Sequence, residues 1–350
     1  MTITRNDADT IRAEASPECA VCARPGRPLY GGLTDYLAGT AGQWRMLRCP
    51  DAACGLLWLD PKPLAADLIK AYATYHTHGG SRTQDPARLW HSAVNSACKQ
   101  LSHLLELGSA LGRQRRELRT MFIGSGSPGT LLEVGCGSGR FLNRMRGLGW
   151  AVEGVEFDPV AAARIEEKYG IPVAVGSLPE LRYAQDKYDV VAMSQVIEHV
   201  HDPVALLKEC RRVLRPGGRL VLSTPNALSV AHRLYGRSWR GLEPPRHLHI
   251  FSPAALENVA RRCGLQVVKL VTLSAESAGI YRASDVIMET QDGQRAAAAS
   301  ASIVRSWLMR YREYRETLRD PHAGQDIFLI ATKQAAAPPL SDLTAFPPRA

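Results

Sequence analysis

The sequence predicts an α/β fold in which a largely parallel sheet is covered by helices on both faces. From residue 130 onward, short apolar runs of strand length alternate with segments whose apolar residues recur three to four positions apart. This alternation is typical of a parallel sheet whose crossover connections are helices. Paired cysteines near the N-terminus indicate a small metal-bound region ahead of the sheet.

The composition is that of a globular protein large enough to bury a sizeable core. The chain has 350 residues, of which 45% are hydrophobic and 22% charged, and this length favours two domains. Gly (29) and Pro (22) show no period, no heptads persist and the apolar content is ordinary, which excludes collagen, coiled coil and wholesale disorder in turn. No run reaches the ~18 apolar residues of a membrane span, and the N-terminus lacks a secretory signal. We therefore expect a cytoplasmic protein with no transmembrane segment.

Changes in pattern divide the chain into parts. Both ends are polar or Ala/Pro-rich and bury too little surface to fold alone. Cys, Gly and Pro among short β-prone runs predict a metal-stapled knuckle, and helical periodicity follows it. The expected parts are disordered tails at 1–15 and 334–350, a zinc-ribbon-like knuckle at 16–60, a helical region or lid at 61–127, and an α/β domain at 128–333 with a helical insertion at 275–325.

Within the α/β domain, seven apolar runs are expected to form the strands. Helices are expected from residue 139, over 159–169, and in a segment ending at "RRVLRPGG". The strands are expected at 130–135, 151–157, 172–176, 188–194, 219–225, 266–273 and 326–333.

The first of these strands ends in a glycine-rich turn, "LLEVGCGSGRFL". Gly135, Gly137 and Gly139 allow positive φ and let a ligand approach the backbone where a helix begins, although a tight turn without a ligand has the same pattern. Arg140 stands where a dinucleotide-binding turn has Gly or Ala, so the pyrophosphate fingerprint is broken. Glu156 ends the second strand, where an acidic residue in such folds binds the hydroxyls of a ribose.

These residues carry a resemblance to class I S-adenosylmethionine-dependent methyltransferases. Matching stretches are "LLEVGCGSGRFL", "VEGVEFDPVAA", "YDVVAMSQVIEHVHDP", "RRVLRPGGRLVLSTPN" and "RHLHIFSP", in the order of that family. The resemblance implies a Rossmann-like sheet of seven strands and S-adenosylmethionine as cofactor. It places Glu133, Gly135, Gly137 and Gly139 at the methionine end, Glu156 and Phe157 at the ribose, Ser177 and Leu178 near the adenine, and Ser194 and Gln195 beneath the sulfonium.

Two histidines are candidates for a base that removes a proton from the acceptor. His199 follows the fourth strand, and His247 lies in the long loop after the fifth. Both are candidates because an imidazole side chain takes up a proton near neutral pH. A packing role is the alternative for both. The same loop offers Trp239, Arg246 and His249 as acceptor contacts, since such loops commonly build the substrate wall.

Four cysteines near the N-terminus form two pairs. Four thiolates at this spacing fit a closed tetrahedral Zn²⁺ site of structural type, whereas two unrelated redox or buried pairs are the alternative. This segment and "LIKAYATYHTH" also resemble a methyltransferase subgroup that includes sugar C-methyltransferases, which implies aromatic residues closing over the acceptor. The metal candidates are Cys19, Cys22, Cys49 and Cys54, and the closing residues are Tyr72, Tyr75 and His76.

Three functions are compatible with these features. The favoured one is methylation of a small-molecule or sugar-linked acceptor at oxygen or carbon. The second is an RNA or protein methyltransferase that uses the basic helix expected at 98–119 and the zinc ribbon. The third is a non-catalytic cofactor-binding scaffold. The net charge of +9 allows attraction to nucleic acid, anionic lipid or a phosphorylated small molecule and does not choose among them. The knuckle is not especially basic and lacks interleaved aromatic residues, which disfavours nucleic acid.

Overall fold

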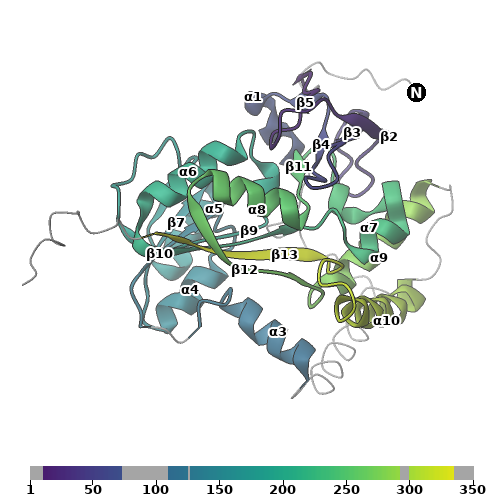
Figure 1. Cartoon of the computed structure of the whole chain (residues 1–350). Coiled ribbons are helices and arrows are strands. Elements are labelled where there is room, and N and C mark those ends of the chain that lie inside the picture. The colour runs from purple at the N-terminus through teal and green to yellow at the C-terminus, as the bar shows by residue number, and fades with distance from the viewer. Residues whose placement is uncertain (1–10, 73–108, 125–126, 292–298, 335–350) are drawn as a thin grey trace, which may run out of the picture.

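The computed structural model describes residues 11–72, 109–124, 127–291 and 299–334 (Figure 1). Its strands are β1 (Ala13–Glu14), β2 (Arg27–Leu33), β3 (Trp44–Arg48), β4 (Leu57–Leu59), β5 (Lys62–Pro63), β6 (Thr130–Val134), β7 (Ala151–Glu156), β8 (Val173–Val175), β9 (Tyr188–Ser194), β10 (Leu214–Pro225), β11 (His249–Ile250), β12 (Leu265–Leu273) and β13 (Asp326–Lys333). Its α-helices are α1 (Ala65–Leu68), α3 (Ala110–Arg119), α4 (Arg140–Gly147), α5 (Pro159–Tyr169), α6 (Pro203–Val213), α7 (Val230–Tyr235), α8 (Pro253–Arg262), α9 (Ser277–Gln291) and α10 (Ala299–Thr317). Short 3₁₀ helices are η2 (Ile69–Tyr72), η3 (Ile197–His199), η4 (Gly236–Ser238) and η5 (Arg240–Leu242).

The main sheet has seven strands, which confirms the predicted fold class. Their order is β12-β13-β10-β9-β6-β7-β8, and β13 runs antiparallel to both of its neighbours. The strands from β8 to β10 are parallel. The order reverses between β6 and β9, and ligands of doubly wound sheets bind at the carboxyl ends of strands at such a reversal.

Helices cover both faces of this sheet because side chains alternate along each strand. Leu132 of β6 packs in the same cluster as Leu207 of α6 and Leu256 of α8. Its neighbour Leu131 packs instead with Met145 of α4 and Ile165 of α5. In Figure 1, α6 and α8 accordingly lie on the opposite side of the sheet from α4.

Three of these helices begin with the same local signal, an N-cap oxygen followed by proline. Asp158, Asp202 and Ser252 accept hydrogen bonds from the first turns of α5, α6 and α8, and the next residue is proline each time. This pairing satisfies free backbone N–H groups and preorganises φ at the first helical position.

The N-terminal region packs against the main sheet. β2, β3 and β4 form a sheet that β11 completes by pairing with β4, although β11 comes from the loop after β10. Trp58 of β4 is 1% exposed and packs in the same cluster as Leu132 and Leu256. The knuckle therefore shares one hydrophobic core with the α/β part.

The structure differs from the expected elements at several ends. Ala13 and Glu14, expected in a disordered tail, form β1 against β5, and Arg12 beside them is ion-paired with Asp67 at 2.8 Å. β10 begins at Leu214, earlier than expected, and is irregular up to Arg219. Of the expected helical region, residues 73–108 lie outside the described residues. No helix in the described ranges is both long and apolar enough to cross a membrane.

Candidate functional site

The glycine turn after β6 lies at the point where the strand order reverses. Gly135, Gly137 and Gly139 have φ values of 72°, 51° and 67°. An added Cβ would lie 2.5 Å from Val196 at Gly135 and 2.8 Å from Ile165 at Gly139. At Gly137 it would meet nothing within 4 Å. Close packing therefore requires two of the glycines, whereas the third faces open space.

Glu156 points at this turn. Its Oε2 accepts a hydrogen bond of 2.7 Å from the Gly137 backbone N–H. Its Oε1 accepts from the N–H groups of Phe157 and Asp158, at 2.9 and 3.1 Å. The carboxylate is thus held in one orientation at the carboxyl end of β7, against the backbone of the glycine turn.

Glu133 brings a second carboxyl group to the same place. It is 5% exposed, and its Oε2 has no hydrogen-bond partner among the described residues. Burial, and then the charge of Glu156, raise the pKa of Glu133 well above its ordinary value. A buried acceptor without a partner is costly, and a cationic group bound beside it would lower both the cost and the pKa.

These observations fit S-adenosylmethionine, whose amino acid end carries an ammonium group and whose ribose carries two hydroxyls. Glu133 would offer an acceptor to the ammonium group, and Glu156 would offer its carboxylate to the ribose hydroxyls.

The structure places the other predicted cofactor residues near this edge in different ways. Phe157, next to Glu156, is 57% exposed, an unusual position for a large aromatic side chain. Ser177 donates to Glu180 at 2.5 Å. The Leu178 side chain is 1% exposed and belongs to the core, which leaves its main chain to line a ligand. Ser194 and Gln195 end β9, where the Ser194 hydroxyl is 2.9 Å from that of Ser223.

The two histidines predicted as bases lie against each other, with His247 buried and His199 half-buried. Their ring centroids are 4.7 Å apart. Nδ1 of His199 donates to the Arg246 carbonyl oxygen at 3.0 Å, and the Tyr72 hydroxyl lies 3.0 Å from the same nitrogen. Burial lowers the pKa of His199.

His247 is held from both sides of its ring. Nδ1 donates to the Gly241 carbonyl oxygen at 2.8 Å, and Nε2 lies 3.3 Å from Glu243. Burial lowers the pKa of His247 to about 3, although the Glu243 carboxylate opposes this shift. Neither His199 nor His247 lines the large cavity described below. This arrangement does not support the predicted basic roles.

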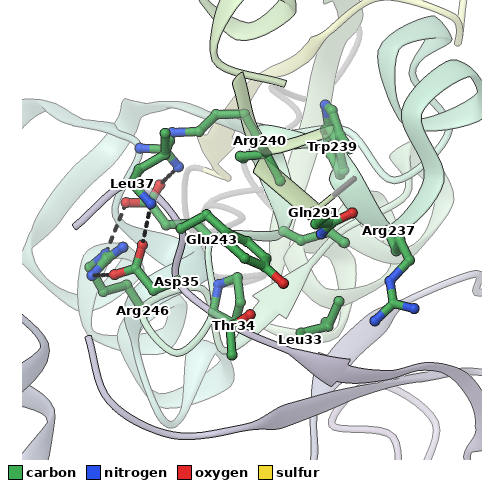
Figure 2. A pocket seen from close by; sticks show the side chains of 14 residues that line it. Leu33, Thr34, Asp35, Leu37, Arg237, Trp239, Arg240, Glu243, Arg246 and Gln291 are labelled. Atoms are coloured by element: carbon green, nitrogen blue, oxygen red, sulfur yellow. Dashed lines mark hydrogen bonds and ion pairs between the residues drawn. The ribbon is translucent and has the colours of Figure 1, made fainter. Parts of the chain in front are cut away.

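Arg246, predicted to contact an acceptor, is instead buried in an ionic network (Figure 2). Its side chain is 1% exposed and is ion-paired with Asp35 at 2.8 Å and with Glu243 at 3.0 Å. Nη1 also donates to the Thr40 hydroxyl and to the Ala71 carbonyl oxygen. The adjoining cavity has a volume of about 20 Å³, which is room for about one water molecule. This network joins the N-terminal region to the loop after β10.

The remaining predicted acceptor contacts are buried as well. Trp239 is 1% exposed and stacks on His232 with centroids 4.7 Å apart. His249 is 1% exposed in β11, and neither ring nitrogen has a hydrogen-bond partner among the described residues. Tyr75 and His76 lie outside the described residues, so their expected role stays a prediction.

The four N-terminal cysteines converge on one point. Sγ atoms of Cys19 and Cys54 are 3.7 Å apart, those of Cys22 and Cys49 are 3.3 Å apart, and all four lie within 4.8 Å of one another. Four thiolates at about 2.3 Å from a tetrahedral zinc ion would have sulfur separations of about 3.8 Å. The cluster therefore fits such an ion, and all four side chains are free thiols.

The sequence did not predict a large cavity in the described part of the chain. It measures about 940 Å³ and lies between the carboxyl ends of β9 and β10, the start of β13, and the helices α3, α9 and α10. Ser194 and Gln195 form part of its wall, as do Asp326 and four arginines. The arginines are Arg115, Arg119, Arg282 and Arg310. The available signals were the arginines of the helical insertion and an aspartate at the start of a mainly apolar strand.

Comparison with known proteins finds a family model and individual relatives that are similar to this chain. A family model described as "Methyltransferase domain" matches residues 90–270, more than half of the chain. Ubiquinone biosynthesis O-methyltransferase of Cereibacter sphaeroides is 35% identical over 149 residues, which are 39% of this chain and 60% of the relative. The protein of that name from Pseudomonas paraeruginosa is 31% identical over 157 residues, or 41% and 68%. The chain thus spans about three fifths of the first relative's length.

Solved structures with a similar chain path are more distant. A SAM-dependent methyltransferase from Archaeoglobus fulgidus is 20% identical with a TM-score of 0.44, covering 64% of this chain and 92% of that one. Phosphoethanolamine N-methyltransferase 2 from Haemonchus contortus, in complex with S-adenosyl-L-methionine, is 19% identical with a TM-score of 0.44, covering 64% and 53%. At these values the fold assignment rests on the strand order given above.

Proposed function

The chain belongs to the methyltransferase-domain family, and from this premise we propose that it transfers a methyl group from S-adenosylmethionine to a hydroxyl group of a small-molecule acceptor. The observation that carries this proposal is the 2.7 Å hydrogen bond from Gly137 to Glu156. It fixes an acidic side chain against the backbone of the glycine turn, at the sheet edge where doubly wound folds bind ligands.

The protein's part in this reaction is binding and alignment. When bound, the cofactor supplies a methyl group already activated by a sulfonium. Glu156 accepts hydrogen bonds from the ribose hydroxyls, and Glu133 offers its buried oxygen to the ammonium group. Holding acceptor, methyl and sulfur in line can supply about 7–11 kcal/mol of the barrier.

Two observations support oxygen as the methylated atom and a small molecule as the acceptor. Several of the relatives that match are named ubiquinone biosynthesis O-methyltransferases. The described cavity of about 940 Å³ has the size of a pocket for a small organic ligand. A sugar-linked acceptor is the finer proposal, supported by the resemblance of the N-terminal region to the sugar C-methyltransferase subgroup. A cytoplasmic location suits the free thiols of the described cysteines.

The cofactor proposal is tested by calorimetry with S-adenosylhomocysteine, the demethylated product. Wild type is expected to bind it with a dissociation constant in the micromolar range, about −8 kcal/mol. Glu156→Ala should weaken binding at least tenfold, because two charge-assisted hydrogen bonds are lost, each contributing about 1.5–3 kcal/mol. Glu167→Ala is the matched control, since Glu167 is exposed on α5. Absence of binding by wild type refutes the proposal.

We also propose that the four cysteines hold a structural zinc ion that folds the knuckle. Four thiolates leave no open position for water, so the ion takes no part in the chemistry. Metal analysis should find about one zinc per chain in wild type and a loss in Cys49→Ser. Cys263→Ser is the control, because Cys263 is buried outside the cluster. Equal zinc content in wild type and Cys49→Ser removes the proposal.

A further inference from the structure

We propose that the cavity enclosed by the sheet edge and the helices α3, α9 and α10 is the acceptor site, that it takes a hydroxylated organic anion, and that Asp326 removes the hydroxyl proton. This inference rests on the proposed function and deepens it. It assigns acceptor binding to the helical insertion and not to the loop that carries His247 and Arg246.

The position of the cavity relative to the cofactor turn carries the first step. Gly135 of the turn lies against Val196, because a Cβ there would be 2.5 Å from the valine side chain. The two residues before Val196, Ser194 and Gln195, line the cavity. The glycine turn and the cavity therefore adjoin across the end of β9, so a ligand in each would meet there.

Asp326 is fixed at that meeting point. As the first residue of β13, it pairs with Pro225 of β10 on one side and with Leu273 of β12 on the other. Its Oδ1 lies 3.4 Å from Nε2 of Gln195. Gln195 has a φ of 56°, which costs an L-residue roughly 1–2 kcal/mol and persists where the surroundings impose it. Backbone pairing thus holds this carboxyl group in the cavity wall beneath the end of β9.

The charges around Asp326 come from several elements. The charge of Glu276, which lies just before α9, raises the pKa of Asp326. The charge of Asp326 in turn raises the pKa of Glu198 in η3 and of Glu313 in α10. Arg115, Arg119, Arg282 and Arg310 line the same cavity from the helices. Burial, opposed by the Gln195 hydrogen bond and increased by the Glu276 charge, raises the pKa of Asp326 to about 7. A carboxyl group with that pKa is suited to accept a proton near neutral pH.

Two of the cavity arginines indicate that the acceptor is an anion. Arg310 is 4% exposed and stacks on Trp307, with its Cζ 4.1 Å from the ring centroid. The guanidinium of Arg115 lies 6.0 Å from the same ring. Both arginines donate to the Ala275 carbonyl oxygen, at 3.2 and 3.5 Å. Two guanidiniums converging on one wall favour binding of a carboxylate or phosphate group there.

The reaction step balances with the groups named. The acceptor oxygen forms a bond to the methyl carbon as the carbon–sulfur bond breaks, and that bond's electron pair stays on sulfur. The hydroxyl proton passes to the carboxylate of Asp326, which becomes a carboxylic acid and later releases the proton to water. The products are a methyl ether and S-adenosylhomocysteine, and no oxidant or metal is required.

The first experiment measures methyl transfer to 3,4-dihydroxybenzoate, a hydroxylated carboxylate with an aromatic body. In wild type, kcat/KM should rise with pH through about 7, because only the carboxylate form of Asp326 accepts the proton. Asp326→Asn should lower kcat by about 10²–10⁴-fold and abolish this rise, while its affinity for S-adenosylhomocysteine stays that of wild type. An unchanged kcat or pH profile in this variant overturns the role of Asp326.

The second experiment tests the anion site by calorimetry on the S-adenosylhomocysteine complex. Wild type should bind 3,4-dihydroxybenzoate at least tenfold more tightly than catechol, which lacks the carboxylate. Arg115→Gln should remove this preference, whereas Arg116→Gln, exposed on the same helix and outside the cavity lining, should keep it. Equal binding of the two probes by wild type, or no binding of either, overturns the assignment of the cavity.

The outcomes separate this inference from the proposed function. A wild-type protein that binds no S-adenosylhomocysteine contradicts the proposed function itself. A wild-type protein that binds it, but neither binds nor methylates 3,4-dihydroxybenzoate, contradicts only the cavity proposal. Retained affinity for S-adenosylhomocysteine in Asp326→Asn also shows that the variant is folded.

Discussion

Replacing Gly137 by alanine should weaken cofactor binding, whereas the same change at Gly135 should mainly lower the stability of the fold. A Cβ at Gly137 would project into open space, with nothing within 4 Å, at the residue whose backbone N–H donates to Glu156. At Gly135 the added Cβ would instead lie 2.5 Å from Val196. The same substitution two positions apart therefore separates a ligand contact from a packing contact.

The expected magnitudes follow from the geometry. Both glycines have positive φ, and alanine in that conformation costs about 1–2 kcal/mol. The overlap with Val196 adds about 1–3 kcal/mol, which brings the cost of Gly135→Ala to roughly 2–5 kcal/mol. Gly170 provides the control, because its φ is 61° and a Cβ there also meets nothing within 4 Å. Gly137→Ala and Gly170→Ala should lower the free energy of unfolding by similar amounts.

Urea unfolding and calorimetry with S-adenosylhomocysteine measure the two effects. Gly137→Ala should bind the ligand at least tenfold more weakly than wild type, a loss of about 1.4 kcal/mol or more. Gly170→Ala should bind it as wild type does, since Gly170 caps the C-terminal end of α5, whereas Glu156 precedes the N-terminal end of that helix. Equal affinity of these two variants would refute the reasoning, because Gly137 would then not face the cofactor.

Three further changes have defined outcomes. Arg246→Met removes one member of a buried ion network and should lower the urea-derived free energy of unfolding by about 3–5 kcal/mol. Arg261→Met, the control, breaks an exposed ion pair and should lower that free energy by less than about 1 kcal/mol. Burial lowers the pKa of His249 from 6.5 to about 3, so the unfolded chain binds that proton more readily and this group's contribution to stability falls as pH drops from 6.5 towards 3. His249→Leu should flatten that part of the stability profile, and an unchanged slope contradicts the assignment. Glu276→Gln removes a charge that raises the pKa of Asp326, so the rise of kcat/KM should move to lower pH, and a shift upward would contradict it.

The fold and the cofactor turn could be predicted because their signals are local. Strand and helix periods repeat over a few residues, and Gly135, Gly137 and Glu156 belong to two successive strand ends. Parallel strands bring such ends to one edge of a sheet wherever the intervening helix packs. The sequence therefore located Glu156 beside the turn without knowledge of the remaining strands.

The acceptor region could not be predicted in the same way. Its wall joins α3 near residue 115, the segment around Ala275, α10 and the start of β13, which are brought together by long-range packing. Neither spacing nor composition specifies such a convergence. The sequence analysis predicted His247, Trp239 and Arg246 as acceptor-site residues. These residue types are equally common in substrate contacts and in buried hydrogen-bonded networks, and the structure shows all three side chains buried.

The hydroxyl of Ser252 has two hydrogen-bond partners, and they connect the cysteine cluster to the start of helix α8. It accepts from the Ala255 N–H at the start of α8 and donates to the carbonyl oxygen of Cys54, a residue nearly two hundred positions earlier in the chain. Removing the proposed zinc ion with a chelator should therefore loosen the first turn of α8, and amide hydrogens there should exchange faster with solvent. Metal supply would then set the rigidity of a helix that no cysteine belongs to.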